Sequence, residues 1–471
     1  MLHVSTRGEA PAIGFTEALL AGLARDGGLY VPETWPALSH GAIRGFAGKR
    51  YADVAKDVLG PLVDGDIPQA ELGRMIEEAY ATFRHPATCP MTQIGDNLFV
   101  LELFHGPTLA FKDVAMQLLG RLMDHALKAR GSRATIVGAT SGDTGSAAVE
   151  AFKGLDQVDV FILYPHGRVS DVQRRQMTTV GSPNIHAIAV EGTFDDCQAM
   201  VKGMFNHARF RDDLRLSGVN SINWARVAAQ TVYYFTAAVS LGGPDRGVSF
   251  SVPTGNFGDI LAGWAAKRMG LPIERLMIGT NANDILARAL GSGSYEIKGV
   301  QPTASPSMDI QISSNFERLL FEAYGRDAGA VRRLMAGLAQ SRAFLIDAEP
   351  LSRIRDEFSA QAVDEPQVAD EMARTYRETG YVIDPHTAIG TRAARALLQE
   401  RPEVPVVALS TAHPAKFPDA VERATGIRPA LPSHMADLME RRETFTVLPN
   451  DEAAVQRFIR ERARAVRGQA A

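Results

Sequence analysis

Six segments of the chain repeat one pattern: a short apolar run, a loop of small polar residues, and then an amphipathic helix. Runs that are apolar throughout suit strands buried on both faces of a parallel sheet. Their alternation with helices indicates doubly wound α/β layers. Six such units exceed one ordinary sheet domain, so we expect two sheets. The six apolar runs are residues 134–139, 158–165, 184–192, 248–252, 275–279 and 404–410.

The first 90 residues follow a different pattern. Apolar residues recur there at three- and four-residue steps, which predicts amphipathic helices over residues 14–24, 51–63 and 71–83. We therefore expect an α/β protein made of two doubly wound parallel-sheet domains and a helical N-terminal extension. The expected domains are a mainly helical one over 1–94, a smaller α/β domain over 95–225, and a larger α/β domain over 226–471.

The bulk composition argues against several classes of protein. The formal net charge of −4 gives no basic surplus, so we expect no nucleic-acid partner. Apolar runs fall short of membrane-spanning length, and the N-terminus does not read as a signal peptide. Two cysteines cannot make a disulfide framework, and the 11 histidines show no metal-ligand spacing, so we expect no metal site. A cytoplasmic protein is the expectation.

A glycine loop follows the fourth apolar run, in the segment PTGNFGDILAGW. Gly255 and Gly258 flank Asn256 and Phe257, and glycine permits a close backbone approach to a ligand. The helix that follows would direct free N–H groups and its positive dipole end at an anion, for which phosphate is the natural candidate. A tight strand-to-helix turn that happens to use glycine is an equally good interpretation of this motif alone.

A second loop of this kind is GATSGDTGSAAVEAF. Ser141, Asp143 and Thr144 could each cap the following helix, and Gly142 lies among them. Capping alone is the simpler interpretation. Three candidate caps with interleaved glycines exceed what capping needs, however, so the loop favours a carboxylate or phosphate ligand.

Two other positions could complete an anion site. Thr411 follows the last apolar run, where its hydroxyl could bond a heteroatom or simply form a local turn. Arg226 stands near a predicted helix start, where the helix dipole disfavours a cation. It either makes a surface ion pair or binds an anion, and the nearby amide of Asn223 favours the second interpretation.

Lys112 lies in the segment HGPTLAFKD, among apolar and small residues rather than on a charged face. Desolvation or a neighbouring charge lowers the pKa of such a lysine, which can then form Schiff bases with carbonyl compounds. The cofactor that joins a reactive lysine to a phosphate site is pyridoxal 5′-phosphate (PLP), an electron sink for carbanions next to an amino group.

With these motifs the chain strongly resembles the threonine synthases, which belong to the tryptophan-synthase-β-like class of PLP enzymes, fold type II. The resemblance covers most of the chain. The matching segments are STRG (5–8), GLARDGGLYVP (22–32), HGPTLAFKD (105–113) and TAHPAKFPDAV (411–421).

The resemblance implies a role for each matching residue. Lys112 would carry PLP as a Schiff base, and Thr411 would bond the pyridine nitrogen. Asp143 stands where many relatives outside the threonine synthases have Asn, which leaves its role open. Asn223 and Arg226 are assigned to the substrate phosphate on charge and position only. Gly255, Asn256, Phe257 and Asp259 match the PLP-phosphate loop, and Ser141, Gly142, Asp143 and Thr144 match the loop for the substrate carboxylate.

The implied reaction converts O-phospho-L-homoserine and water to L-threonine and phosphate, in a monomer or homodimer. A threonine or serine dehydratase, or a phosphohomoserine lyase, on the same fold is the nearest alternative. A catalytically silent relative that acts as a binding protein is a more distant one, and retention of Lys112 argues against it. The missing Walker and dinucleotide fingerprints make a nucleotide-binding protein remote.

Overall fold

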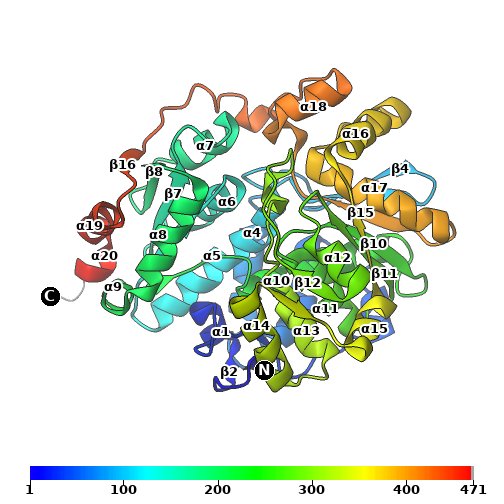
Figure 1. The fold of residues 1–471 in the computed structure, drawn as a ribbon, viewed down its shortest axis with the longest axis horizontal. Coiled ribbons are helices and arrows are strands. Elements are labelled where there is room, and N and C mark those ends of the chain that lie inside the picture. The colour runs from blue at the N-terminus through cyan, green and yellow to red at the C-terminus, as the bar shows by residue number, and fades with distance from the viewer. Residues whose placement is uncertain (468–471) are drawn as a thin grey trace.

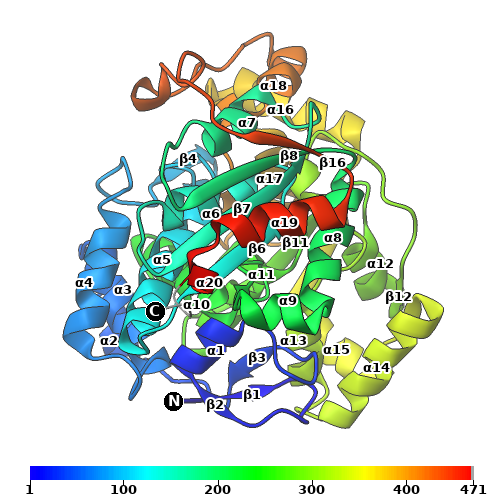
Figure 2. The ribbon, with the colours of Figure 1, turned by 90° about the vertical axis from the view of Figure 1, so that its left-hand side faces the viewer.

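The computed structural model describes residues 1–467, which form two twisted sheets with helices on both faces of each (Figures 1 and 2). The larger sheet has the strand order β14-β11-β10-β15-β5-β4, in which only β4 runs antiparallel to its neighbour. Its strands are β4 (Met91–Gly95), β5 (Leu98–Glu102), β10 (Val248–Pro253), β11 (Ile273–Thr280), β14 (Phe358–Ala362) and β15 (Val406–Ser410).

Apolar side chains project from both faces of this sheet, which is why its strands read as continuous apolar runs. On β11, Leu276 and Ile278 join the core shared with α10 and α11, whereas Met277 between them packs with α17 residues on the opposite face. The helices around this sheet are α10 (Trp224–Ser240), α11 (Gly258–Arg268), α12 (Ile285–Ser292), α16 (Glu365–Thr379) and α17 (Pro385–Glu400).

The smaller sheet is parallel throughout, with the order β16-β8-β7-β6-β9. Its strands are β6 (Ala134–Ala139), β7 (Val158–Pro165), β8 (Ile185–Glu191), β9 (Leu216–Ser217) and β16 (Thr446–Pro449). Ile162 faces α5 and α6, and its neighbour Phe161 faces α8 and α19. The helices on its two faces are α5 (Lys112–Ala129), α6 (Asp143–Phe152), α7 (Asp171–Thr178), α8 (Phe194–Asn206), α9 (Ala208–Asp213), α19 (Glu452–Arg462) and α20 (Arg464–Arg467).

All six predicted apolar runs form strands, three in each sheet, but the predicted domain boundaries need two corrections. Strand β5, which we assigned to the smaller domain, pairs with β15 in the larger sheet, with Leu98 opposite Val406. Strand β16, assigned to the larger domain, pairs with β8, with Thr446 opposite Ile188. Boundaries drawn along the chain cannot represent this, because each sheet takes a strand from the opposite end of the sequence.

The N-terminal extension contains the three predicted helices and also a small antiparallel sheet, β2-β1-β3, that the sequence pattern did not reveal. These strands have two to four residues, too few for a periodic signal. Helix α3 packs on α10 and helix α4 on α5, so the extension covers both sheet units. Its elements are β1 (Leu2–Ser5), β2 (Ile13–Gly14), α1 (Phe15–Ala21), β3 (Tyr30–Pro32), α2 (His40–Arg44), α3 (Tyr51–Leu59), η1 (Gly60–Leu62) and α4 (Gln69–Tyr80).

The remaining elements form connections around the larger sheet and between the two sheets. Within the described residues, no helix has the length and apolar character needed to cross a membrane. These elements are β12 (Ser294–Glu296), η2 (Pro306–Met308), α13 (Phe316–Ala323), α14 (Ala328–Ser341), β13 (Ala343–Leu345), α15 (Ala348–Glu357), η3 (Pro414–Lys416), α18 (Pro418–Thr425) and η4 (Ser433–Met435).

Candidate active site

Lys112 is the first residue of α5, and its side chain is buried. Its Nζ lies 3.4 Å from Oδ2 of Asp143 and 3.4 Å from Oγ of Ser307. Burial lowers the pKa of Lys112, although the Asp143 carboxylate acts in the opposite direction. The N–H of Phe111 donates to the carbonyl of Thr411 over 2.8 Å. This bond ties the start of α5 to the end of β15, so the expected cofactor lysine and the expected hydroxyl residue share one site.

Asp143 makes further contacts beyond Lys112. It accepts hydrogen bonds from Oγ of Ser307 (3.0 Å) and Nε2 of Gln173 (2.9 Å), and Nζ of Lys416 lies 2.8 Å from its Oδ1. Burial alone would raise the pKa of Asp143, but the charges of Lys416 and Lys112 outweigh it and hold the pKa well below its ordinary value. Asp143 is therefore an ionised group bonded on all sides. We had expected this loop to bind the substrate carboxylate, but the negatively charged side chain of Asp143 is unsuited to that role.

Sequence reasoning missed two side chains of this cluster, Lys416 and Ser307. Lys416 is fully buried on η3, where it also donates to the carbonyl of Thr108 over 2.8 Å. The sequence signal for Lys416 was a lysine placed inside a loop that prolines stiffen. Ser307 gave no signal, since it is 195 residues from Lys112 along the chain. Its loop is held at the end of β11, where Nδ2 of Asn281 donates to Asp309 over 2.8 Å.

The loop at the start of α6 has the geometry expected of an anion site. Oγ1 of Thr140 accepts the N–H groups of Gly142 and Gly145, each over 2.9 Å, which folds the loop back on itself. Gly142 has φ 141°, and a Cβ there would lie 2.4 Å from the Gln173 side chain, so glycine is required. The hydroxyls of Ser141 and Thr144 bond to nothing within residues 1–467, and both are half-buried. Hydroxyls and first-turn N–H groups are thus available to a ligand.

Hydrogen bonds from two side chains fix the loop between β10 and α11. Oγ of Ser313 donates to the carbonyl of Gly255 (2.6 Å), and Nδ2 of Asn315 donates to the carbonyl of Asn256 (3.0 Å). The N–H groups of Gly255, Asn256 and Phe257 have no hydrogen-bond partner in the described part of the chain. A Cβ on Gly255 would lie 3.0 Å from the carbonyl oxygen of Ser307. Free N–H groups before a helix suit a phosphate.

Two side chains of this predicted phosphate loop point elsewhere. The Phe257 ring is buried against Phe316 and Phe358, with centroids 5.3 and 5.8 Å apart. Asp259 is buried and accepts the hydroxyls of Tyr233 and Tyr234, and burial raises its pKa to about 6. These residues can therefore serve a ligand only through their backbone.

Thr411 is buried at the carboxyl end of β15. Its hydroxyl makes no hydrogen bond to any described residue, although its backbone holds Phe111. The neighbouring Ser410 has its hydroxyl 2.8 Å from Oγ1 of Thr387, so that strand end is fixed. A hydroxyl that has no partner, on an otherwise buried residue, is available to a bound heteroatom.

Arg226 is 4% exposed and faces no carboxylate within ion-pair distance in the described residues. Its Nη1 donates to the carbonyl of Val219 (3.1 Å), and its Nε lacks a partner. Burial lowers its pKa to about 10, and its charge contributes to the lowered pKa of Lys112. Arg226 therefore makes no surface ion pair. A buried cation without a counter-charge is unfavourable, so the site favours an anionic ligand beside Arg226.

Asn223 has a local structural use. Its Oδ1 accepts the N–H of Ala225 (3.1 Å) and so caps α10, and its Nδ2 donates to the carbonyl of Leu19 (2.8 Å). The amide that we had assigned to the substrate phosphate instead fixes the start of the helix that carries Arg226.

PLP fits this set of residues. The buried lysine of lowered pKa matches the aldehyde of the cofactor, the loop with three free N–H groups matches its phosphate, and the free hydroxyl of Thr411 matches its ring nitrogen. The fold and this site define the chain as a PLP-dependent α/β enzyme of fold type II.

Comparison with known families makes the identification specific. Family models match residues 2–80 (threonine synthase N terminus), 85–412 (pyridoxal-phosphate dependent enzyme) and 387–459 (threonine synthase, C-terminal). The chain belongs to the threonine synthase family.

Individual relatives agree over almost the whole length. Threonine synthase of Pseudomonas aeruginosa is 54% identical over 460 residues, which cover 98% of each chain. That of Saccharomyces cerevisiae is 43% identical and covers 90% of this chain and 89% of its own. The crystal structure of PLP-bound threonine synthase from Brucella melitensis superposes with a TM-score of 0.96 at 62% identity, over 98% of this chain and 100% of the other. The chain is a PLP-dependent enzyme, and a dehydratase is not favoured.

Proposed function

We propose that the enzyme converts O-phospho-L-homoserine and water to L-threonine and inorganic phosphate. The observation that carries this choice of substrate is Arg226, a buried cation without a carboxylate partner. Its charge contributes to the lowered pKa of Lys112. An amino acid that lacks a phosphate leaves this cation uncompensated. Phosphohomoserine brings a second anionic group to it, besides its carboxylate.

Lys112 is the base of the proposed reaction. When bound, PLP supplies an electron sink that stabilises carbanions next to the substrate nitrogen. Burial lowers the pKa of Lys112, so a larger fraction of its amine is neutral and able to take the proton from the substrate α-carbon. The α- and β-protons leave before the γ-phosphate can depart. A proton then adds at the γ-carbon, the oxygen of water adds at the β-carbon, and a proton returns to the α-carbon, which gives L-threonine and phosphate. Apolar cover and the Asp143 contact keep Nζ in place during these transfers.

Three separate anion positions support the assignment. The N–H groups of Gly255, Asn256 and Phe257 are assigned to the cofactor phosphate, and the hydroxyl of Thr411 to the pyridine nitrogen. The N-terminal turn of α6 with Ser141 and Thr144 is assigned to the substrate carboxylate. Arg226 is assigned to the substrate phosphate, and Asn223 only positions it. Separate carboxylate and phosphate positions favour a synthase over a dehydratase, whose substrate carries no phosphate.

Asp143 and Lys416 are assigned to charge balance next to Lys112. A lone carboxylate at this depth would attract a proton, but paired with Lys416 it stays ionised. It can then hold Nζ of Lys112, together with Ser307, while the lysine exchanges protons with the substrate. We propose this role for Asp143, whose function the sequence left open.

The test is the substitution Arg226→Met, which keeps the buried length and removes the charge. Loss of a charge-assisted contact worth about 1.5–3 kcal/mol predicts a specificity constant for phosphohomoserine roughly 10- to 150-fold lower. Arg209→Met removes the same charge from an exposed residue of α9 and serves as the matched control. An unchanged kcat/KM in Arg226→Met would rule out this role.

We further propose that the enzyme works in the cytoplasm as a monomer or homodimer. Both cysteines, Cys89 and Cys197, are buried free thiols, as is common in a reducing compartment. Light scattering coupled to size-exclusion chromatography measures the oligomeric state.

A further inference from the structure

Arg318, in the first turn of α13, is a buried cation that the proposed reaction does not use. It is 1% exposed, and within residues 1–467 it makes no ion pair with a carboxylate. Burial lowers its pKa to about 9, so the guanidinium stays charged at neutral pH. Hydrogen bonds must offset the cost of burying such a charge, so the groups that accept them indicate what Arg318 does.

The three acceptors of Arg318 lie on three separate segments of the chain. Its Nε donates to the carbonyl of Tyr30 on β3 over 2.9 Å, and its Nη2 donates to the carbonyl of Ile222 over 2.6 Å. Its Nη1 donates to Oδ1 of Asn315, the residue before α13. Because the donors of a guanidinium have fixed directions, this one group sets the positions of β3, the segment before α10 and the Asn315 amide relative to one another.

Asn315 connects Arg318 to the predicted phosphate loop. It is fully buried, and its Nδ2 donates to the carbonyls of Asn256 (3.0 Å) and Ser221 (3.1 Å). A guanidinium donates only to the oxygen of an amide, so Arg318 keeps the nitrogen of Asn315 turned toward Asn256. The peptide unit is planar, so a fixed Asn256 carbonyl also fixes the N–H of Phe257, which points the opposite way. That N–H is one of the three free N–H groups of the loop.

The two N-terminal motifs, STRG and GLARDGGLYVP, support the same helix start. In the first motif, Oγ1 of Thr6 and Nη2 of Arg7 donate to the carboxylate of Glu317, over 2.6 and 3.0 Å. In the second motif, Tyr30 supplies the carbonyl that Arg318 bonds. Both motifs therefore hold the first turn of α13 against the small N-terminal sheet, although neither motif contributes a group to the site itself.

We propose that Arg318 is a positioning residue for the cofactor. Through Asn315 it holds the phosphate loop in the conformation that binds the phosphate of PLP, and the N-terminal sheet is its fixed support. The proposal rests on the proposed function in one respect, the assignment of the N–H groups of Gly255, Asn256 and Phe257 to the cofactor phosphate.

The test compares the binding of PLP with that of pyridoxal, which has the same ring and aldehyde but no phosphate. Both are titrated into the enzyme freed of PLP, in phosphate-free buffer, and followed by the absorbance of the Schiff base with Lys112. Arg318→Met should weaken PLP binding at least about tenfold, the value of one hydrogen bond to a charged group, and should change pyridoxal binding less than about threefold. General damage to the fold would weaken both alike, and the choice of substrate does not enter the measurement.

A second variant, Asn315→Leu, leaves Arg318 its bonds to Tyr30 and Ile222 and removes only the link to Asn256. It should lower the preference for PLP over pyridoxal by a similar factor. The double variant should lower it little further, because both residues act through one contact.

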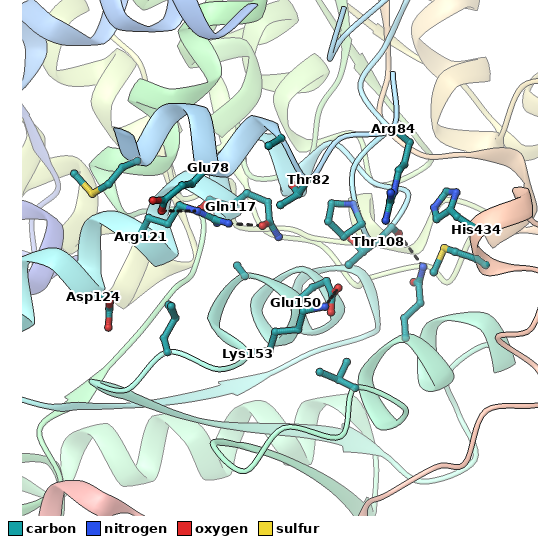
Figure 3. Close-up of a pocket in the computed structure, with 18 of the residues that line it drawn as sticks. Glu78, Thr82, Arg84, Thr108, Gln117, Arg121, Asp124, Glu150, Lys153 and His434 are labelled. Carbon is teal, nitrogen blue, oxygen red and sulfur yellow. Dashed lines mark hydrogen bonds and ion pairs between the residues drawn. The ribbon is translucent and has the colours of Figure 1, made fainter. Parts of the chain in front are cut away.

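The matched control is Arg121→Met on α5. Like Arg318, Arg121 donates to a backbone carbonyl and to a side-chain amide oxygen, both of Gln117, over 2.7 and 3.2 Å. It lines a cleft between α4, α5 and α6 that Lys112 does not line, where Figure 3 shows it beside Gln117 and Glu78. This variant should keep the wild-type preference for PLP.

Two kinds of result would overturn the proposal. The first is an unchanged preference for PLP in Arg318→Met or Asn315→Leu, or losses that simply add in the double variant. The second is a wild type that binds pyridoxal as tightly as PLP, which would overturn the assignment of the loop to the cofactor phosphate and this proposal with it.

Discussion

Replacing Lys416 by methionine should unbalance the charges behind the active site. The Lys416 ammonium is fully buried and lies 2.8 Å from Oδ1 of Asp143, which is itself 4% exposed. Removal of one member of a buried ion pair leaves the other charge uncompensated, at a cost of about 3–5 kcal/mol. Lys112 and Gln173 still contact Asp143 in the variant, so we expect the lower end, about 3 kcal/mol of lost unfolding free energy.

The assay is a double-mutant cycle on the enzyme freed of PLP, with urea unfolding followed by tryptophan fluorescence. Asp143→Asn keeps an oxygen that accepts from Gln173 and removes the negative charge. Lys416→Met combined with Asp143→Asn contains neither member of the pair, so it should be more stable than Lys416→Met alone. A loss below about 1 kcal/mol in Lys416→Met, or losses that simply add in the double variant, would refute the reasoning.

Three further substitutions test other parts of the site. Lys112→Ala should abolish the visible Schiff-base absorbance of the purified enzyme; a coloured variant, or a colourless wild type that PLP cannot reconstitute, would contradict the cofactor assignment. Thr411→Val should weaken PLP binding roughly two- to tenfold in a fluorescence titration, as expected for one neutral hydrogen bond. Asp259 has a pKa raised to about 6, so it binds a proton more tightly in the folded than in the unfolded chain. Through this group the wild type should lose stability as the pH rises from about 4 to 6, a slope that Asp259→Asn should reduce in thermal melts at several pH values; an unreduced slope would show that Asp259 does not titrate there.

Local pattern predicted much of the fold, because the strands of both sheets are buried on both faces. Continuous apolar runs such as 158–165 in β7 then stand out from the surrounding helices. The assignment of strands to sheets was not predictable in this way. Nothing in residues 98–102 indicates a partner near residue 406, because register depends on packing between distant segments.

For the candidate site, too, the sequence indicated the residues with an unusual local setting but not the contacts between distant segments. Lys112, Thr411 and the two glycine loops stand out because each has an unusual local setting. Ser307 and Lys416 contact Asp143 only through the tertiary fold, so spacing along the chain does not indicate these contacts. The proline-stiffened loop around Lys416 was the one local signal, and it names no partner for the lysine. Three predictions failed for the opposite reason, because the residues stand within the expected motifs but have local structural uses. Asn223 caps a helix, and the side chains of Phe257 and Asp259 are buried in the core.

The product balance on O-phospho-L-homoserine tests the central claim most directly. The PLP-loaded enzyme should release inorganic phosphate and L-threonine in equal amounts, measured in one sample by a phosphate assay and by amino-acid chromatography. Release of phosphate together with 2-oxobutyrate, or no turnover of this substrate, would contradict the account.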